Sequence, residues 1–161
     1  MEHHNHLFGI HTITEAIKTG RSIEKVYLQK GSKGNLFKTL EALVHKNGIP
    51  KSYVPAAKLN KLVKGNHQGV VALISPIEYQ DFEPLVTQIM DQNDNPLFLL
   101  LDQITDVRNF GAIIRTAECT GVSAIVVPKT GSAPINGQTI KTSAGAAFKV
   151  PMAKVDHLKD A

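Results

Sequence analysis

The sequence predicts an α/β protein in two parts, a small three-layer α/β unit followed by a domain with a parallel sheet. Short apolar runs and amphipathic segments alternate between residues 7 and 74. Two later apolar runs, 97–101 and 124–127, flank another amphipathic segment, which is typical of strands buried on both faces of a parallel sheet. Between the parts, residues 76–95 are rich in acidic residues and prolines around one weak helix at 85–90, which predicts a linker. The predicted division is therefore 1–75 for the first domain, 76–95 for the linker and 96–161 for the second domain.

The elements of the first part follow from hydrophobic spacing and helix-ending residues. In chain order we expect a helix ending at Gly20, a strand at 25–29, a helix at 36–46, a strand at 50–54, a short helix at 56–63 and a strand at 70–74. The apolar stripe of the helix at 36–46 comprises Leu36, Phe37, Leu40, Leu43 and Val44. This alternation of strands and helices predicts helices on both faces of a small sheet.

The helix of the second part is predicted from apolar residues at helical spacing: Phe110, Ile113, Ile114, Ala117 and Gly121. Asn109 stands immediately before this stripe and is a candidate N-cap, because its side-chain oxygen can accept a free amide hydrogen of the first turn. At about 100° per residue, Arg115 lies about 140° from Phe110, so we expect its guanidinium to avoid the sheet. Glu118, three residues further, is a candidate ion-pair partner for Arg115.

Composition and charge limit the classes of protein that fit but do not indicate a function. Of 161 residues, 42% are apolar, which is enough for a core. A formal charge of +4 and a pI near 9.2 suit polyanion binding but are common in other proteins too.

Cys119 is the only cysteine, which excludes an intrachain disulfide and fits a reducing compartment. We expect it to be buried. No apolar run approaches the roughly 20 residues of a membrane span, so we expect a cytoplasmic protein.

Several kinds of chemistry are disfavoured by missing motifs. The chain has no G-x-G turn of the kind that holds S-adenosylmethionine in Rossmann-like methyltransferases, no P-loop and no nucleophile elbow. Cys119 lies mid-helix, which disfavours methylation through a cysteine adduct. His3, His4 and His6 could in principle bind a transition metal, but a polar arm is the better interpretation, and we expect no metal.

Four stretches resemble one family. D-V-R-N-F-G-A-I-I-R-T-A-E at 106–118 and K-T-S-A-G-A-A-F-K-V-P at 141–151 resemble motifs of the SpoU (TrmH/RlmB) ribose 2′-O-methyltransferases, of the trefoil-knotted SPOUT superfamily. F-G-I-x-x-I-x-E-A-I at 8–17 and H-Q-G-V-V-A at 67–72 resemble the substrate-binding domain of the same family, which has the fold of ribosomal proteins that bind kinked RNA. The resemblance extends over the whole chain.

The resemblance implies S-adenosylmethionine-dependent methylation of a ribose 2′-hydroxyl, most like the RlmB enzymes that act on a guanosine of 23S ribosomal RNA, by a homodimer formed through the SPOUT domain. It implies catalytic roles for Asn109 and Arg115. A guanidinium is a poor base, so the safer role for Arg115 is to orient phosphate and stabilise the developing alkoxide. The alternative for Asn109 is a plain helix cap.

In the family most of the cofactor pocket is formed by a knotted segment that contains two further motifs, G-N-E-x-x-G and S-L-N-V-S. Neither motif occurs here, so we expect the 161-residue chain alone to be inactive. Ser143 and Gly145 are the candidates for a cofactor contact within this chain, with close packing of chain segments as the equal alternative. Phe148 departs from the family, which often has glutamate there.

RNA contacts are predicted for basic and polar residues near loops. The candidates are Lys30, Lys33, Lys51, Lys58, Lys61, Lys64, His67, Gln68 and Arg108. For any single lysine the alternative is a solvated surface charge, and for His67 and Gln68 it is a structural role in a turn. The alternative function is a non-catalytic RNA-binding protein.

Overall fold

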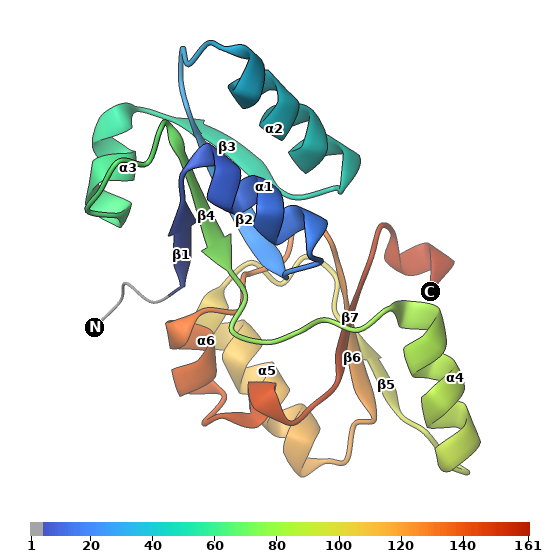
Figure 1. Ribbon diagram of the computed structural model, residues 1–161. Helices are drawn as coiled ribbons and strands as arrows, with labels where there is room; N and C mark the ends of the chain where they lie inside the picture. The colour runs from blue at the N-terminus through green and yellow to red at the C-terminus, as the bar shows by residue number, and fades with distance from the viewer. Residues whose placement is uncertain (1–4) are drawn as a thin grey trace. The chain divides into compact units, whose positions relative to one another are not determined.

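A computed structural model of the chain describes residues 5–161 and divides into two compact units, Met1–Ser75 and Pro76–Ala161 (Figure 1). We call them the first unit and the second unit. Each has its own sheet, with four strands in the first unit and three in the second. His3 and His4 lie outside the described residues. Among the described residues, no helix is long and apolar enough to cross a membrane.

The first unit is a three-layer α/β structure, as predicted. Its elements are β1 (His6–Phe8), α1 (Ile10–Lys18), β2 (Ile23–Gln29), α2 (Asn35–Lys46), β3 (Lys51–Val54), α3 (Ala56–Leu62) and β4 (Val70–Ile74). The strand order is β1-β4-β2-β3; β4 runs antiparallel to β1 and β2, and β3 runs parallel to β2. Helices α1 and α2 cover one face of the sheet and α3 lies on the other (Figure 1).

Alternation along the strands divides the first unit's core between these two faces. Val26, Leu28, Val70 and Ala72 pack with α1 and α2. On the opposite face Tyr27, Val54, Leu59, Val63 and Val71 form a smaller cluster beneath α3. Helix α3 has only seven residues, so it covers only part of its face.

Two predictions for the first unit were wrong in detail. The strand β1 was not predicted, because three residues carry too little alternation to indicate a strand. Leu36 was placed on the apolar stripe of α2 but is 57% exposed. It lies about 100° before Phe37 on the helix, at the border of the stripe, whereas Phe37, Leu40 and Val44 are buried.

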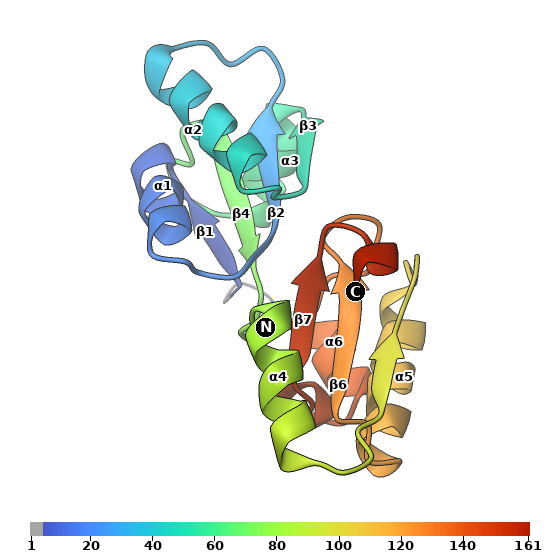
Figure 2. The same ribbon diagram turned by 90° about the vertical axis from the view of Figure 1, so that its right-hand side faces the viewer.

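The second unit contains a parallel sheet, as predicted, but residues 97–101, expected to be buried on both faces, include an edge strand, and Leu97 and Leu100 are about half exposed. Its elements are α4 (Phe82–Gln92), β5 (Phe98–Leu100), α5 (Val107–Cys119), β6 (Ala124–Pro128), α6 (Gly137–Thr142), the 3-10 helix η1 (Ala146–Phe148), β7 (Met152–Val155) and the 3-10 helix η2 (Leu158–Asp160). The order is β5-β6-β7 with all pairs parallel. Helices α5 and α6 lie on one face of the sheet and α4 lies on the other (Figure 2).

Residues 76–95, which we expected to link the domains, contain a helix that forms part of the second unit. Leu85 and Ile89 of α4 are buried together with Ala124 and Ala153 of the sheet. The Gln80 amide also donates to the Met152 carbonyl at 2.9 Å. This segment therefore supplies one layer of the second unit.

Candidate functional site

The candidate site of the second unit begins where β5 and β6 end. The amide of Ala133, in the loop after β6, donates to the carbonyl of Ile104, in the loop after β5, at 2.7 Å. The loops that leave these neighbouring parallel strands are therefore joined. In open α/β sheets, ligands bind at this carboxyl edge of the strands, so the polar residues of these loops and of the start of α5 are the candidates for a ligand site.

The N-cap of α5 is Asp106, and the prediction of Asn109 as the cap was wrong. The Asp106 carboxylate accepts from the amides of Arg108, at 3.0 Å, and Asn109, at 2.8 Å. The helix begins at Val107, three residues before the buried stripe begins at Phe110, so the apolar pattern indicated its start too late. The negative charge of Asp106 also lies at the positive end of the helix dipole.

Because Asp106 caps the helix, the Asn109 side chain is not needed for that role. Asn109 is exposed, and among residues 5–161 its side-chain amide makes no hydrogen bond, although its backbone amide donates to Asp106. Arg108 beside it is exposed as well. Both side chains are thus available to a ligand from solvent.

Arg115 is exposed, as predicted from its angle on the helix. The expected pairing with Glu118 is absent. Glu118 instead accepts from Lys149 at 3.0 Å, so it joins α5 to the residue after η1. Within the described part of the chain Arg115 has no ion-pair partner, and its guanidinium keeps its donors for an external anion.

Asn109 and Arg115 are not brought into contact by α5. Six residues of helix separate them by about 9 Å along the axis and about 120° around it. A ligand that touches both would have to span the side of the helix. The two predicted roles are therefore compatible with one extended ligand rather than with one reacting atom.

Helices α5 and α6 approach so closely at Gly111 that a side chain does not fit. A Cβ atom there would lie 2.7 Å from the Thr142 Cβ and 2.9 Å from the Thr139 carbonyl oxygen. Thr139 and Ser143 are fully buried in this contact region. The small residues of these helices thus serve close packing.

Ser143 and Gly145, the candidates for a cofactor contact, are engaged within the fold. The buried Ser143 hydroxyl donates to the Ile140 carbonyl at 3.0 Å and accepts from the Ala147 amide at 3.4 Å. Gly145 adopts a left-handed conformation, with φ of 84°, and its amide donates to the Ile140 carbonyl at 3.1 Å, a geometry that ends α6. These two residues do not provide a free donor for S-adenosylmethionine.

Cys119 was expected to be buried, and this was wrong: it is exposed. It is the last residue of α5, two residues after the buried Ala117, and so it lies off the stripe that faces the sheet. Phe148, where the family often has glutamate, is also exposed, at 62%. No group of three or more metal-ligating side chains is found among the described residues.

In the first unit, the loops that carry several candidate lysines meet at one end of the sheet. The Gln29 amide donates to the Gly69 carbonyl at 2.8 Å. A Cβ atom on Gly69 would lie 2.9 Å from the Ser32 hydroxyl, so the loop after β2 lies against the loop before β4. The lysines that these loops and α3 carry are exposed: Lys30, Lys33, Lys58, Lys61 and Lys64.

His67 and Gln68, also candidates for RNA contact, hold this end of the first unit together. The Nδ1 atom of His67 accepts from the Gly69 amide at 3.0 Å, and Nε2 lies 2.8 Å from the Asn60 amide oxygen. The Gln68 amide oxygen accepts from the Ile10 amide at 3.0 Å, which satisfies one free donor at the start of α1. The structural alternative accounts for the contacts of both residues.

Lys51 is engaged by Glu41 and differs in this from the loop lysines. Its ammonium lies 3.3 Å from a Glu41 carboxylate oxygen, and the Tyr53 hydroxyl donates to the same oxygen. The hydrogen bond from Tyr53, with a smaller contribution from Lys51, lowers the pKa of the Glu41 carboxyl, and the same bond raises the pKa of Tyr53. Lys51 is therefore a weaker candidate for a phosphate contact.

Two family models match successive parts of the chain. The model described as RNA 2′-O ribose methyltransferase substrate binding matches residues 6–80, and that of the SpoU rRNA methylase family matches residues 96–161. The first match covers the unit that carries the lysine loops, and the second covers the parallel sheet with α5. The chain belongs to the SpoU/TrmH family of RNA methyltransferases.

Curated relatives give the same result. A putative TrmH family tRNA/rRNA methyltransferase of Bacillus subtilis, YacO, is 35% identical over 158 residues, which is 98% of this chain and 63% of that protein. A Staphylococcus aureus protein with the same family description is 36% identical over 152 residues, covering 94% of this chain and 61% of that protein. The chain thus spans less than two thirds of the length of these relatives.

Two solved structures with bound AdoMet are more distant. An rRNA methyltransferase from Sinorhizobium meliloti is 21% identical with a TM-score of 0.41, over 93% of this chain and 53% of that one. The SpoU methyltransferase AviRb from Streptomyces viridochromogenes is 18% identical with a TM-score of 0.44, over 96% and 55%.

Proposed function

We propose that this chain provides the RNA-binding unit and the arginine-bearing helix of an enzyme that transfers a methyl group from S-adenosylmethionine to a ribose 2′-hydroxyl of RNA. The observation that carries the proposal is the state of Arg115. It is an exposed guanidinium without an ion-pair partner among the described residues, on a helix that Asp106 caps, inside the segment that matches the methylase model.

Arg115 would act on the substrate electrostatically. Loss of the 2′-hydroxyl proton builds negative charge on an oxygen that lies close to a backbone phosphate, and a guanidinium can contact both anions with its planar set of donors. Asn109, whose side chain is not used for capping, would help to position the same RNA strand. S-adenosylmethionine supplies the methyl group when it is bound.

The substrate we propose is ribosomal RNA, with a guanosine of 23S RNA as the specific target, and the enzyme would act as a cytoplasmic homodimer. The ribosomal substrate is supported by the rRNA methylase description of the match over 96–161, and binding of RNA by the substrate-binding match over 6–80. The exposed loop lysines of the first unit would contact phosphates, and Arg108 would add a contact near α5.

The cofactor requirement provides a direct test. Because the Ser143 hydroxyl and the Gly145 amide are engaged within the fold, we expect the 161-residue chain to bind no S-adenosylmethionine in a calorimetric titration and to methylate no RNA. A form extended to the length of its relatives should bind the cofactor and methylate a ribose 2′-hydroxyl, which mass mapping of the RNA locates. Cofactor binding by the 161-residue chain would show that its own residues suffice to hold S-adenosylmethionine, against this proposal. The absence of methylation by the extended form would favour a non-catalytic RNA-binding protein.

A further inference from the structure

We infer that the first unit contains a pocket for a single unpaired nucleobase, with the ring of Phe8 as its stacking surface. The inference rests on the proposed RNA-binding function of this unit and adds a specific subsite to it. A cavity of about 280 Å³ lies between β1 and the end of α3 and is lined by His6, Phe8, Val63 and Lys64. Its size is just below the range for drug-sized ligands, which suits one heterocyclic ring.

The Phe8 side chain is unusually exposed to solvent for a large apolar residue in a strand. Its partner across the sheet, Val71, is completely buried, yet Phe8 itself remains 37% exposed. The reason is the short α3, which covers Tyr27 and Val71 through Leu59 and Val63 but does not extend over β1. An aromatic ring is therefore accessible beside the apolar side chain of Val63, and nucleobases stack on accessible aromatic rings in single-stranded nucleic-acid sites.

Gly65 lies close to the edge of the Phe8 ring. A Cβ atom on Gly65 would lie 3.0 Å from Cε2 and 3.1 Å from Cζ of Phe8, and its φ of 155° is a conformation that other residues rarely adopt. The loop after α3 thus packs against the ring edge and restricts its movement. A ring held in this way loses little freedom when a base stacks on it.

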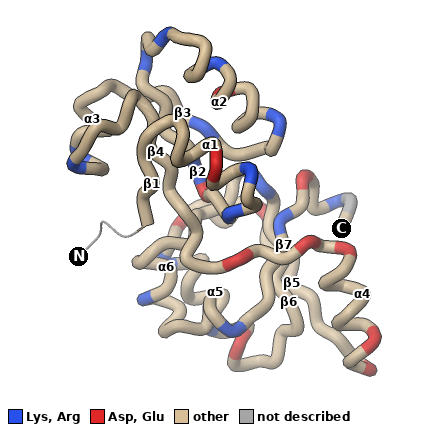
Figure 3. Tube along the Cα trace, in the orientation of Figure 1, with Lys and Arg blue, Asp and Glu red and all other residues tan. Residues whose placement is uncertain are grey.

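The stretch of chain that supplies Val63 and Lys64 to the cavity carries charges of one sign. Residues 42–77 contain Lys46, Lys51, Lys58, Lys61 and Lys64 and no acidic residue, and the Lys and Arg positions near α3 are visible in Figure 3. Lys64 lines the cavity itself, and the ammonium groups of Lys58 and Lys25 lie 5.7 Å from the ring centre of Tyr27, next to Val63 in the same cluster. A base in the cavity would therefore carry its phosphates past several cations, which favours RNA over a neutral apolar ligand.

The test uses the 161-residue chain and an RNA hairpin with one 2-aminopurine in its loop. Stacking on Phe8 should quench the fluorescence of the probe on binding. Phe8→Leu keeps an apolar contact without the ring and should bind about 5- to 150-fold more weakly, with the quenching lost. Leu36→Ala, which removes an exposed apolar side chain from α2, is the control and should change neither.

Two results would overturn the inference in distinguishable ways. If RNA binds with its usual salt dependence but Phe8→Leu binds and quenches like the unsubstituted chain, the pocket is wrong and RNA binding by the first unit stands. If no variant binds RNA even at low salt, the proposed RNA-binding function fails and the pocket fails with it. NMR shifts of the Phe8 ring protons in the unsubstituted chain give the same answer without a substitution, because a stacked base shifts them and phosphate contacts alone leave them in place.

Discussion

Among the described residues, the polar candidates just before β4 in the first unit have hydrogen-bond partners for their side chains, and the candidates on α5 in the second unit have none. In the first unit, the polar residues chosen from the sequence as RNA contacts near β4 hold loops together: His67 binds the Gly69 amide and Gln68 caps α1. In the second unit, Asp106 performs the capping, and Asn109 and Arg115 keep their side chains free of partners within the described residues. A polar residue is a better functional candidate when the fold already has another residue for the structural task.

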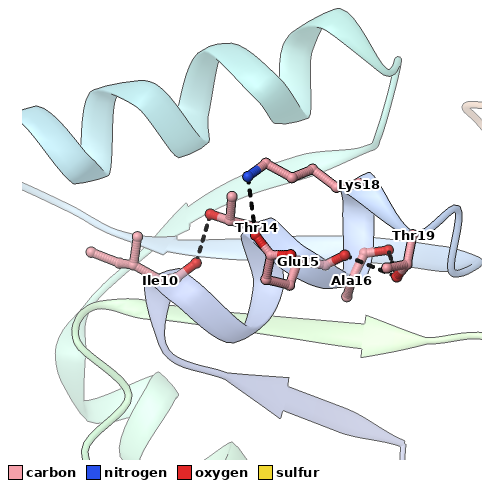
Figure 4. Close-up of polar contacts among 6 residues, drawn as sticks. All are labelled: Ile10, Thr14, Glu15, Ala16, Lys18 and Thr19. Carbon is pink, nitrogen blue, oxygen red and sulfur yellow. Dashed lines mark hydrogen bonds and ion pairs between the residues drawn. The ribbon is translucent and has the colours of Figure 1, made fainter.

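The same contrast holds for the charges of the first unit. Lys18 of α1 pairs with Glu15 at 3.0 Å (Figure 4), and Lys51 pairs with Glu41. The lysines of α3 and of the loop that follows it have no acidic neighbour in the sequence. Exposure alone does not separate these groups, whereas the presence or absence of an acidic partner does.

The largest expected effect comes from the free arginine of the second unit. In a form of the protein that methylates RNA, Arg115→Ala should lower turnover at least about a hundredfold, the scale of losing one well-placed electrostatic contact. Arg115→Lys should rescue poorly, because an ammonium lacks the planar set of donors. Steady-state kinetics would measure both, with Arg21→Ala in the first unit as the control for loss of an exposed arginine. Turnover near normal in either Arg115 variant would leave Arg115 without a catalytic role.

The second effect is on stability and concerns only the second unit. Gly111→Ala places a methyl group 2.7 Å from Thr142 and should cost about 1–3 kcal/mol, as overpacking does. Gly137→Ala is the matched control, because nothing lies within 4 Å of a Cβ atom there. Hydrogen exchange with mass readout should show faster exchange in α5 and α6 and no change in β2 or β4. Faster exchange throughout both units would mean that their stabilities are coupled.

A third prediction separates the free lysines from the paired ones. Lys61→Ala and Lys64→Ala should each weaken RNA binding and lower the slope of log affinity against log salt by about 0.7–0.9, the value for one phosphate contact. Lys18→Ala and Lys51→Ala remove the same charge from an ion pair and should change the slope less. Fluorescence anisotropy at several salt concentrations measures this. Equal slopes for all four variants would show that binding depends on net charge and not on a defined surface.

Sequence reasoning succeeded where one local pattern determined the outcome. The burial of Phe110, Ile114 and Ala117 in α5, the exposure of Arg115 and the parallel pairing of β5 and β6 all follow from apolar spacing within about 30 residues. Gly121, which was placed on the same stripe, follows the helix and is exposed. It failed where the partner is distant or the element is very short. The Glu118 partner is Lys149, 31 residues away, and the three residues of β1 acquire their strand pairing only from β4. The N-cap was misplaced because the first three residues of α5, before Phe110, contribute no fully buried apolar side chain.

The smallest effect concerns the engaged charges of the first unit. The Tyr53 hydroxyl bond lowers the pKa of the Glu41 carboxyl, so the bond stabilises the fold above the ordinary glutamate pKa, and this contribution is lost as pH falls through the lowered value. Tyr53→Phe should therefore raise the pKa of Glu41 toward 4.5, the ordinary value, and Lys51→Ala should raise it less. An NMR titration of the Glu41 side chain would measure both shifts. Tyr27→Phe removes a hydroxyl from the opposite face of the same sheet and should leave the pKa of Glu41 unchanged. If the pKa of Glu41 does not respond to Tyr53→Phe, Lys51 alone holds this carboxylate. The contrast between paired and free lysines then rests on the ion pair only.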